Sequence, residues 1–323
     1  MRRRAFLSLG VLPLLGSASY PAVTPRKLVF PRDHGAHPDF RIEWWYVTGW
    51  LAGPVGFQVT FFRARPENDD PANPSSFNPR QVLFAHAAVS DPKRGRLVHD
   101  ERAARAGLSL AQAETDRTAV WIDDWRLEQR GERYDASIRA RDFSLELRFF
   151  AHGIVLQGEQ GLSRKGHRPN EASYYYSRPH LKVAGKLDGR DVEGSAWLDH
   201  EWSSAYMAPE AAGWDWCGIN LDDGGSLMAF RMRNRAGGLH YASPGTNFKV
   251  VRIWKSPRTG VEYPVEMAVN DLVLKPLMDD QELDSRASTG TIYWEGAVTA
   301  FKNNNPVGRG YLELTGYWKP MKL

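Results

Sequence analysis

Two carboxylic acids, one imidazole and two indoles lie within six consecutive positions of this 323-residue chain. The segment reads Trp197-Leu198-Asp199-His200-Glu201-Trp202. In an extended strand, neighbouring side chains point to opposite faces, so Asp199 and Glu201 share one face while His200 lies on the other. Groups of these kinds can bind a metal, activate a nucleophile or transfer protons, and the neighbouring strands decide which of them meet.

The first two kinds of chemistry lack their motifs. The His-Glu-x-x-His pattern of zinc peptidases fails because position 204 is Ser, and metal ligands are sparse elsewhere in the chain. No Gly-x-Ser-x-Gly elbow occurs, and a place beside His200 in the sequence does not by itself give Ser203 or Ser204 the geometry of a catalytic triad. We therefore expect no metal, no cofactor and no serine-hydrolase site.

Proton-driven addition of water to an alkene is the third possibility. A carboxylic acid would protonate the double bond, and water would capture the resulting carbocation. Burial among aromatic side chains raises the pKa of an Asp or Glu, and indole faces stabilise a cation. Asp215, between Trp214 and Trp216, is the first candidate for the acid, and Asp199 and Glu201 are the alternatives.

A domain junction between the strands that carry His200 and Asp215 would let these side chains share one cleft. In this hypothesis His200 orients Asp215 or activates water, while Trp202 and Tyr175 form the wall of the cleft. The other expected ligand contacts are Trp214, Trp216, Glu43 and Trp45. Structural roles compete with these assignments, because aromatic residues at strand spacing often belong to the core and Glu43 could form a buried ion pair with Arg178.

The elements that must position these side chains are predicted to be strands. Short runs of alternating apolar and polar residues, broken by Gly, Pro and Asn, lie at 43–51, 56–62, 82–90, 144–150, 174–177, 214–221, 226–233, 248–254, 290–295 and 310–317. The one persuasive helix is the short segment Ser109–Glu114. We predict an all-β chain of barrels or sandwiches, whose interiors can hold a ligand.

Length and pattern together predict two domains. The composition, 42% hydrophobic and 25% charged, is typical of globular proteins, and 323 residues exceed what one small core needs. The strand pattern is weakest at 205–213, so we place the junction there, between an N-terminal domain at 28–205 and a C-terminal domain at 206–323. The segment 66–79, rich in Pro and acidic residues, is expected to be a mobile insertion.

The first residues predict export. Arg2-Arg3-Arg4 precedes an apolar run at 5–15 that is too short to span a bilayer, and the small residues at 16–19 offer a cleavage site. Arg3-Arg4-Ala5-Phe6-Leu7 resembles a twin-arginine signal, so we expect a signal peptide at 1–19 and a periplasmic or secreted protein. The lone Cys217 excludes an internal disulfide, and the scattered basic residues argue against a nucleic-acid partner.

Several motifs, taken together, resemble one protein family. They are Glu43-Trp44-Trp45-Tyr46, Ser173-Tyr174-Tyr175-Tyr176-Ser177-Arg178-Pro179, and the segments 196–203, 213–216, 293–297 and 310–317. The chain is similar, nearly end to end, to the AttH-type secreted lipocalin-like proteins that are labelled predicted secreted hydrolases and are related to carotenoid 1,2-hydratases. This resemblance implies two lipocalin-like β-barrel domains.

The resemblance also bears on the reaction. Carotenoid hydratases share a His-x-Trp motif like His200-Glu201-Trp202 and add a Tyr-x-Asp on a following strand, where this chain reads Leu227-Met228-Ala229-Phe230-Arg231. The missing acid favours a substrate other than a carotenoid. We favour an enzyme that hydrates an isoprenoid or lipid-like molecule; the alternative is a non-catalytic periplasmic carrier of a hydrophobic ligand. The expected partners are an apolar small molecule and either an ABC transporter or a membrane surface.

Overall fold

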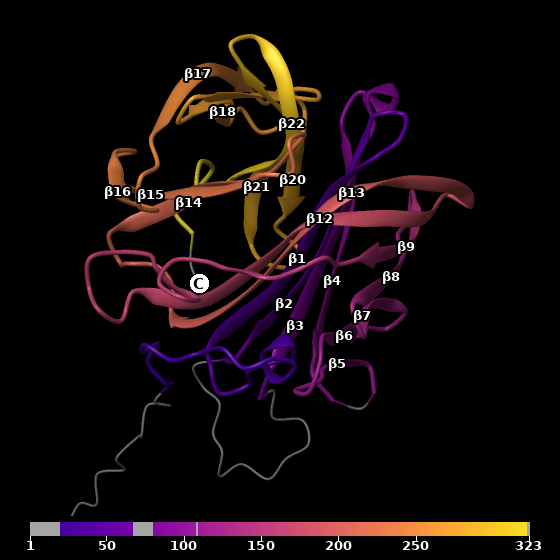
Figure 1. Ribbon diagram of the computed structural model, residues 1–323, viewed down its shortest axis with the longest axis vertical. Helices are drawn as coiled ribbons and strands as arrows, with labels where there is room; N and C mark the ends of the chain where they lie inside the picture. Colours follow the sequence, from indigo (N-terminus) through magenta and orange to yellow (C-terminus); the bar gives the residue numbers. More distant parts are fainter. Residues whose placement is uncertain (1–19, 67–79, 108, 322–323) are drawn as a thin grey trace, which may run out of the picture.

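Antiparallel strands make up nearly all of the computed structural model, which describes residues 20–66, 80–107 and 109–321 (Figure 1). The predicted all-β fold is confirmed, and the two curled sheets correspond to two lipocalin-like barrels. The expected signal peptide at 1–19 and residues 67–79 of the expected insertion lie outside the described residues. No helix of the described part has the length and apolar character that crossing a membrane requires.

The first sheet contains thirteen strands in the order β4-β3-β2-β1-β13-β12-β9-β8-β7-β6-β5, with β10 and β11 paired to β12. Their bounds are β1 (Ile42–Leu51), β2 (Val55–Ala64), β3 (Val82–Ser90), β4 (Leu97–Arg105), β5 (Ala111–Ala113), β6 (Ala119–Ile122), β7 (Trp125–Arg130), β8 (Arg133–Arg139), β9 (Ser144–Phe150), β10 (Val155–Leu156), β11 (Leu162–Arg164), β12 (Ala172–Leu187) and β13 (Arg190–Ala205). Two 3-10 turns, η1 (Arg32–His34) and η2 (Pro92–Arg94), flank the strands.

The second sheet contains nine strands in the order β16-β15-β14-β22-β21-β19-β18-β17, with β20 paired to β21. Their bounds are β14 (Ala211–Leu221), β15 (Ser226–Asn234), β16 (Leu239–Ala242), β17 (Phe248–Lys255), β18 (Glu262–Val269), β19 (Leu272–Pro276), β20 (Glu282–Ser285), β21 (Thr291–Lys302) and β22 (Asn305–Leu314). The chain passes from the first sheet to the second between Ala205 and Ala211, within the segment where the sequence pattern is weakest.

The helix expected at Ser109–Glu114 is wrong. Residues Ala111–Ala113 form β5 instead, and Ala111 pairs with Ile122 of β6. A segment of six residues closes too few hydrogen-bonded turns to offset helix nucleation, whereas a neighbouring strand supplies backbone partners at once.

Strands β1 and β13 are buried on both faces because they separate two cores. One face carries Trp45 and Trp202 into the core of the first barrel. The other face carries Tyr46 and Trp197 into an aromatic cluster shared with the second barrel. This double burial explains why β1 reads as an almost continuous buried run rather than as a half-buried strand.

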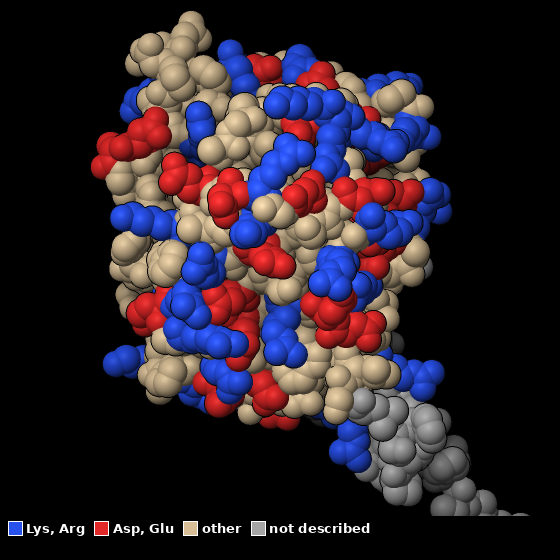
Figure 2. All heavy atoms as spheres, turned by 90° about the vertical axis from the view of Figure 1, so that its right-hand side faces the viewer, with Lys and Arg blue, Asp and Glu red and all other residues tan. Residues whose placement is uncertain are grey.

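Charges of both signs are interspersed on the face of the molecule that Figure 2 shows. Lys and Arg side chains alternate there with Asp and Glu, without a broad area of one sign. Such a surface has no extended positive stripe of the kind that follows a nucleic-acid backbone.

Candidate active site

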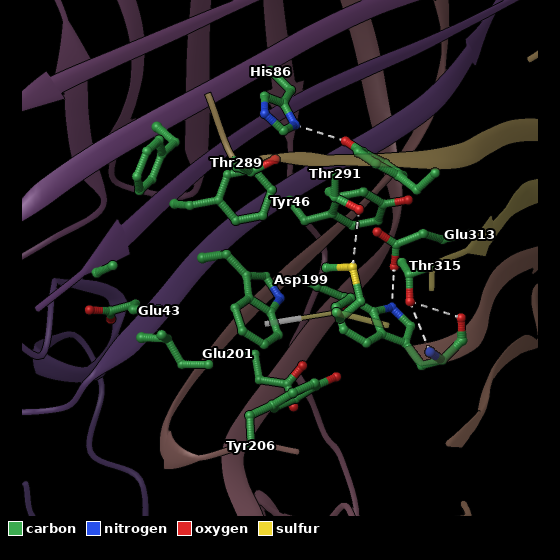
Figure 3. Close-up of a pocket in the computed structure, with 18 of the residues that line it drawn as sticks. Glu43, Tyr46, His86, Asp199, Glu201, Tyr206, Thr289, Thr291, Glu313 and Thr315 are labelled. Atoms are coloured by element: carbon green, nitrogen blue, oxygen red, sulfur yellow. Dashed lines mark hydrogen bonds between the residues drawn. The ribbon is translucent and has the colours of Figure 1, made fainter. Parts of the chain in front are cut away.

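A cavity of about 280 Å³ lies where the two barrels meet. β1, β2, β3, β12 and β13 of the first sheet supply one side, and β14, β21 and β22 of the second supply the other (Figure 3). Nine aromatic residues line it: Trp44, Tyr46, Phe62, Phe84, Tyr175, Tyr206, Trp214, Trp216 and Tyr293. Four acidic residues, Glu43, Asp199, Glu201 and Glu313, also border it. An apolar chamber with a few acids is suited to an apolar ligand that reacts with a proton.

Asp199 is almost wholly buried, with 3% of its surface exposed. Its Oδ1 accepts hydrogen bonds from Ser177 Oγ at 2.5 Å and from Trp197 Nε1 at 2.6 Å, and its Oδ2 accepts one from the Tyr175 hydroxyl at 2.6 Å. Burial raises the pKa of Asp199 to about 7, against the lowering effect of these three donors. The donors favour the carboxylate form, and Oδ2 keeps a lone pair for a further partner.

Glu313, on β22, borders the cavity with fewer partners. Its Oε2 accepts a hydrogen bond from Trp214 Nε1 at 2.6 Å (Figure 3), and among the described residues no hydrogen bond reaches Oε1. Burial raises the pKa of Glu313 to about 7, and the nearby negative charges of Asp199 and Glu201 add to the effect. With a single donor and one free oxygen, Glu313 is the group in the cavity best placed to hold a proton and to give it away.

Glu201 is tied to a buried lysine. Lys165 Nζ lies 2.7 Å from Glu201 Oε1, and Ser173 Oγ also donates to this oxygen. The ammonium group is enclosed by aromatic rings, with the ring centroid of Phe230 at 4.0 Å and that of Tyr175 at 4.8 Å. Burial raises the pKa of Glu201, and Lys165 opposes that shift. Glu201 is therefore engaged in an ion pair, which leaves Asp199 and Glu313 as the pair free for proton transfer.

Polar groups from both barrels meet at another part of the cavity. His86 Nδ1 lies 2.8 Å from the Tyr293 hydroxyl (Figure 3), and His86 Nε2 lies 2.9 Å from Ser288 Oγ. Burial lowers the pKa of His86 to about 3, so its imidazole is neutral at pH 7. These groups can exchange hydrogen bonds with an oxygen atom of a ligand.

His200, Trp202 and Trp45 do not line the cavity, which corrects their predicted place in it. They lie on the other face of β1 and β13, in the first barrel, where His200 stacks on Trp45 at 4.8 Å and Trp202 on His37 at 3.7 Å between ring centroids. Burial lowers the pKa of His200, so it is a neutral, hydrogen-bonded core residue. The alternation along β13 is as predicted: Asp199 and Glu201 face the cavity, and His200 faces away.

Glu43 borders the cavity, but residues of the first barrel bind its carboxylate. Oε1 accepts from His37 Nδ1 and His200 Nε2, both at 2.8 Å, and Oε2 accepts from Arg63 Nε at 2.9 Å. Burial alone would raise the pKa of Glu43, but His37 and Arg63 hold it well below its usual value.

The atoms of His37, Glu43 and His200 that could ligate a metal ion lie within 4.8 Å of one another. They already hydrogen-bond to each other, and the Arg63 guanidinium beside them repels a cation. We assign this cluster to the core of the first barrel.

The ion pair expected between Glu43 and Arg178 is also wrong. Glu43 pairs with Nε of Arg63, a residue of the neighbouring strand β2. Arg178 pairs with Glu132 at 2.6 Å and with the ring nitrogen of His34 at 3.1 Å.

Asp215 does not share a cleft with His200. It points to the opposite side of β14 from Trp214 and Trp216, because alternate residues of a strand face opposite ways. There it is fully buried and pairs with Arg231 at 2.6 Å, with Arg233 at 2.9 Å and with the Tyr317 hydroxyl at 3.0 Å. Both carboxyl oxygens of Asp215 are paired with guanidinium groups inside the second barrel, away from the cavity, so Asp215 is not the acid there.

The other predicted site residues do meet. Tyr175, Trp214 and Trp216 border the cavity with Asp199 and Glu201, and Trp216 Nε1 donates to the Tyr175 hydroxyl at 3.0 Å. The sequence analysis missed Glu313, Tyr46, His86 and Lys165. The sequence does contain a signal for Glu313, because this acidic residue lies between Leu312 and Leu314 in a predicted strand.

Comparison with known proteins shows what the chain is similar to. The family model described as AttH-like matches residues 21–317. A solved AttH protein from Nitrosomonas europaea is 47% identical, with a TM-score of 0.85, and the alignment covers 93% of this chain and all of that one. Kievitone hydratase from Nectria haematococca has the same fold at 13% identity and a TM-score of 0.61, with 90% of this chain and 94% of that chain covered. No curated protein matches the chain.

Proposed function

The chain belongs to the AttH-like family, and we propose that it catalyses the acid-driven addition of water to a carbon–carbon double bond, or the reverse elimination, in the cavity between its barrels. One observation carries the proposal: Asp199 and Glu313 border an aromatic chamber with pKa values of about 7. A hydratase exists on this fold, so the fold accommodates such chemistry.

The proton on Glu313 starts the reaction. Its Oε1–H adds to one carbon of the alkene, the π electron pair forms the new C–H bond, and the neighbouring carbon becomes a cation. A carboxylic acid with a pKa near the working pH is protonated often enough to react and acid enough to donate. Trp214, which donates to Glu313 Oε2, leaves Oε1 directed at the substrate.

The aromatic wall stabilises the cation. Indole and phenol faces carry negative charge density, so a cation enclosed by Trp214, Trp216 and Tyr46 is stabilised relative to one in an aliphatic pocket. The same rings exclude bulk water, which strengthens every charge interaction inside. A substrate of isoprenoid or lipid-like character fits such a wall.

Asp199 completes the cycle. Water attacks the cation, and the oxonium loses its proton to Oδ2 of Asp199, which keeps a lone pair beside its bond from Tyr175. A proton then returns from Asp199 to Glu313 through water, so one alkene and one water give one alcohol. The similar pKa values of the two carboxyls make this return nearly isoenergetic.

The test is a set of isoprenoid and other apolar alkenes incubated with the protein in H₂¹⁸O, with ¹⁸O-labelled alcohol detected by mass spectrometry. We expect Glu313→Gln to lower turnover by at least about 100-fold, the contribution of a general acid, while ligand affinity changes by less than about tenfold. The exposed Glu193 gives the matched control Glu193→Gln, which should leave turnover unchanged.

The alternative, a carrier of a hydrophobic ligand, predicts a different pattern. Such a protein would bind alkenes without any ¹⁸O-labelled product, and Glu313→Gln would leave every measured property of binding intact. Export to the periplasm or beyond, with an ABC transporter as a partner, remains part of our proposal under either function.

A further inference from the structure

A second cavity, of about 500 Å³, lies away from the domain interface, between the N-terminal segment and the β7–β8 hairpin. Its wall is apolar at Phe30, Pro31 and Ile154 and polar at His34, Gln129, Glu132, Arg117 and Arg178. Arg178 is the residue at its inner end, with only 1% of its surface exposed. A buried guanidinium requires anionic or hydrogen-bonding partners, so its contacts decide what the cavity can bind.

One side of Arg178 is fixed by a chain of buried hydrogen bonds. Arg178 Nη2 lies 3.1 Å from His34 Nε2, and His34 Nδ1 lies 2.8 Å from the Tyr176 hydroxyl. That hydroxyl lies 3.2 Å from His200 Nδ1, and His200 Nε2 lies 2.8 Å from Glu43 Oε1.

The two ends of this chain set the direction of every bond in it. Arg178 can only donate and Glu43 can only accept, so each group between them donates toward Glu43. His34 therefore carries its proton on Nδ1 and offers Nε2 as an acceptor. This chain of hydrogen bonds orients the Arg178 guanidinium, but none of its members places a negative charge next to the guanidinium.

On its other side, Arg178 is available to a ligand. Its one carboxylate partner is Glu132, at 2.6 Å, and the Glu132 side chain is 74% exposed. Among the described residues Arg178 Nε has no hydrogen-bond partner, and neither has Oε1 of the buried Gln129. An exposed, flexible glutamate is easily displaced, and an unpartnered buried donor gains from a ligand oxygen.

The backbone of β12 bends at this point. The register of β12 with β13 shifts between Arg178 and Leu181, and His180 adopts a positive φ of 55°. Pro179 follows Arg178 directly, so this position donates no backbone hydrogen bond. A β-bulge re-aims the side chains next to it, and here it accompanies the turn of Arg178 toward the cavity.

We propose that this second cavity binds a carboxylate that carries an apolar chain, with the carboxylate on Arg178 in place of Glu132 and the chain against Phe30, Pro31 and Ile154. The charged residues distinguish it from the cavity between the barrels, whose lining has four acids and one arginine, whereas this lining has two arginines and one acid. The basic rim residue Arg117 adds to the attraction.

The test is calorimetric titration of the full chain with decanoate, with acetate and decanol as probes that lack the chain or the charge. We expect one decanoate site, and affinities for acetate and decanol lower by at least about tenfold. Arg178→Gln should weaken decanoate binding by at least about tenfold, because it removes a charge-assisted pair. Glu132→Gln should strengthen it by about threefold or more, because the competing carboxylate is gone.

Two control variants show whether the changes in decanoate affinity are specific to this cavity. Glu210→Gln removes an exposed carboxylate that also pairs with an arginine, Arg168, and should leave decanoate affinity unchanged. Trp214→Ala alters the other cavity and should also leave it unchanged. Loss of binding in Trp214→Ala, or an affinity that neither Arg178→Gln nor Glu132→Gln changes, would overturn the proposal. If Arg178→Gln does not fold, the direction of the change in Glu132→Gln decides alone.

Discussion

Glu313 and Asp199 reach a pKa of about 7 from different surroundings. Glu313 has one hydrogen-bond donor and two negative neighbours, whereas Asp199 has three donors and one negative neighbour. Because the two pKa values are alike, we assign the roles from hydrogen bonding: three donors hold Asp199, whereas Oε1 of Glu313 accepts no bond among the described residues and is free to carry the proton. The difference assigns Glu313 as acid and Asp199 as base.

Catalysis should have a narrow optimum near pH 7. Activity needs Glu313 protonated and Asp199 ionised, so it falls above pH 7 as the first loses its proton and below pH 7 as the second gains one. The measurement is kcat/KM for alkene hydration against pH. A profile that is flat from pH 5 to pH 9 would contradict the assignment of these two carboxyls.

The raised pKa of Glu313 should also make the free energy of unfolding depend on pH. The folded protein keeps this proton up to about pH 7, whereas the unfolded chain releases it near 4.5, so stability falls as pH rises between these values. Glu313→Gln removes this loss: its free energy of unfolding should match wild type near pH 4 and exceed it by about 3 kcal/mol at pH 8. Urea unfolding at both pH values measures the difference, with Glu193→Gln as a control that should show none.

At the scale of residues, the sequence placed some of the candidate site residues correctly and others wrongly. Alternation separated Asp199 and Glu201 from His200 correctly, because strand geometry fixes which residues share a face. It could not tell which face meets the second barrel, and so His200 and Trp202 were placed on the wrong side. Asp215 was misplaced because its counter-ions Arg231 and Arg233 come from the next strand, and pairing between strands cannot be derived from spacing.

At the scale of elements, β1 and β13 organise both the core and the cavity. β1 pairs with β13 along its whole length, with Glu43 opposite Trp202 and Tyr46 opposite Asp199. One face of the pair is packed by the His37, Glu43 and His200 network, and the other lines the cavity. The network thus fixes the strands that position Asp199.

Breaking this network should destabilise the fold. Glu43→Gln keeps the shape but removes the charge that compensates the buried Arg63 guanidinium, at a cost of about 3–5 kcal/mol. Urea unfolding at pH 7 gives this value directly. A loss below about 1 kcal/mol, the range of exposed ion pairs, would show that Glu43 is not a structural anchor.

The strand pattern was the most reliable part of the sequence analysis. The run at 43–51 lies in β1, and most of the run at 310–317 lies in β22, which ends at Leu314. Short elements were harder: Ser109–Glu114 became β5 because its partner β6 is set by tertiary contacts that the local sequence does not encode.

At the scale of the whole molecule, a buried acid joins the two barrels. The Tyr46 hydroxyl of the first barrel donates to Glu295 Oε1 of the second, and Trp50 Nε1 donates to the Gly310 carbonyl oxygen at 3.0 Å. Burial raises the pKa of Glu295 well above its usual value, and among the described residues its Oε2 has no partner. The cavity exists because these contacts hold the barrels face to face.

Tyr46→Phe should therefore loosen the interface. It leaves Glu295 buried without its donor, which should lower the free energy of unfolding by about 1–3 kcal/mol. Scanning calorimetry measures the change, with Tyr241→Phe, at a partly exposed tyrosine of β16, as the control. An unchanged thermal transition would mean that this contact does not hold the barrels together.

Export is a property of the whole chain and remains a prediction. Arg3→Lys with Arg4→Lys should abolish periplasmic accumulation, because a twin-arginine signal depends on both guanidinium groups. Cell fractionation measures it, and Arg2→Lys should be exported normally. Normal accumulation of the double variant would rule out this route.

The central claim is that Glu313 is a protonated acid in the cavity at neutral pH, and infrared difference spectroscopy tests it without a substrate. We predict carbonyl absorption of protonated carboxylic acids at pH 6 that disappears with a midpoint near pH 7; Glu313→Gln should lose the component of Glu313 and keep that of Asp199. A spectrum without such absorption at pH 6, or absorption that persists unchanged in Glu313→Gln, would contradict the account.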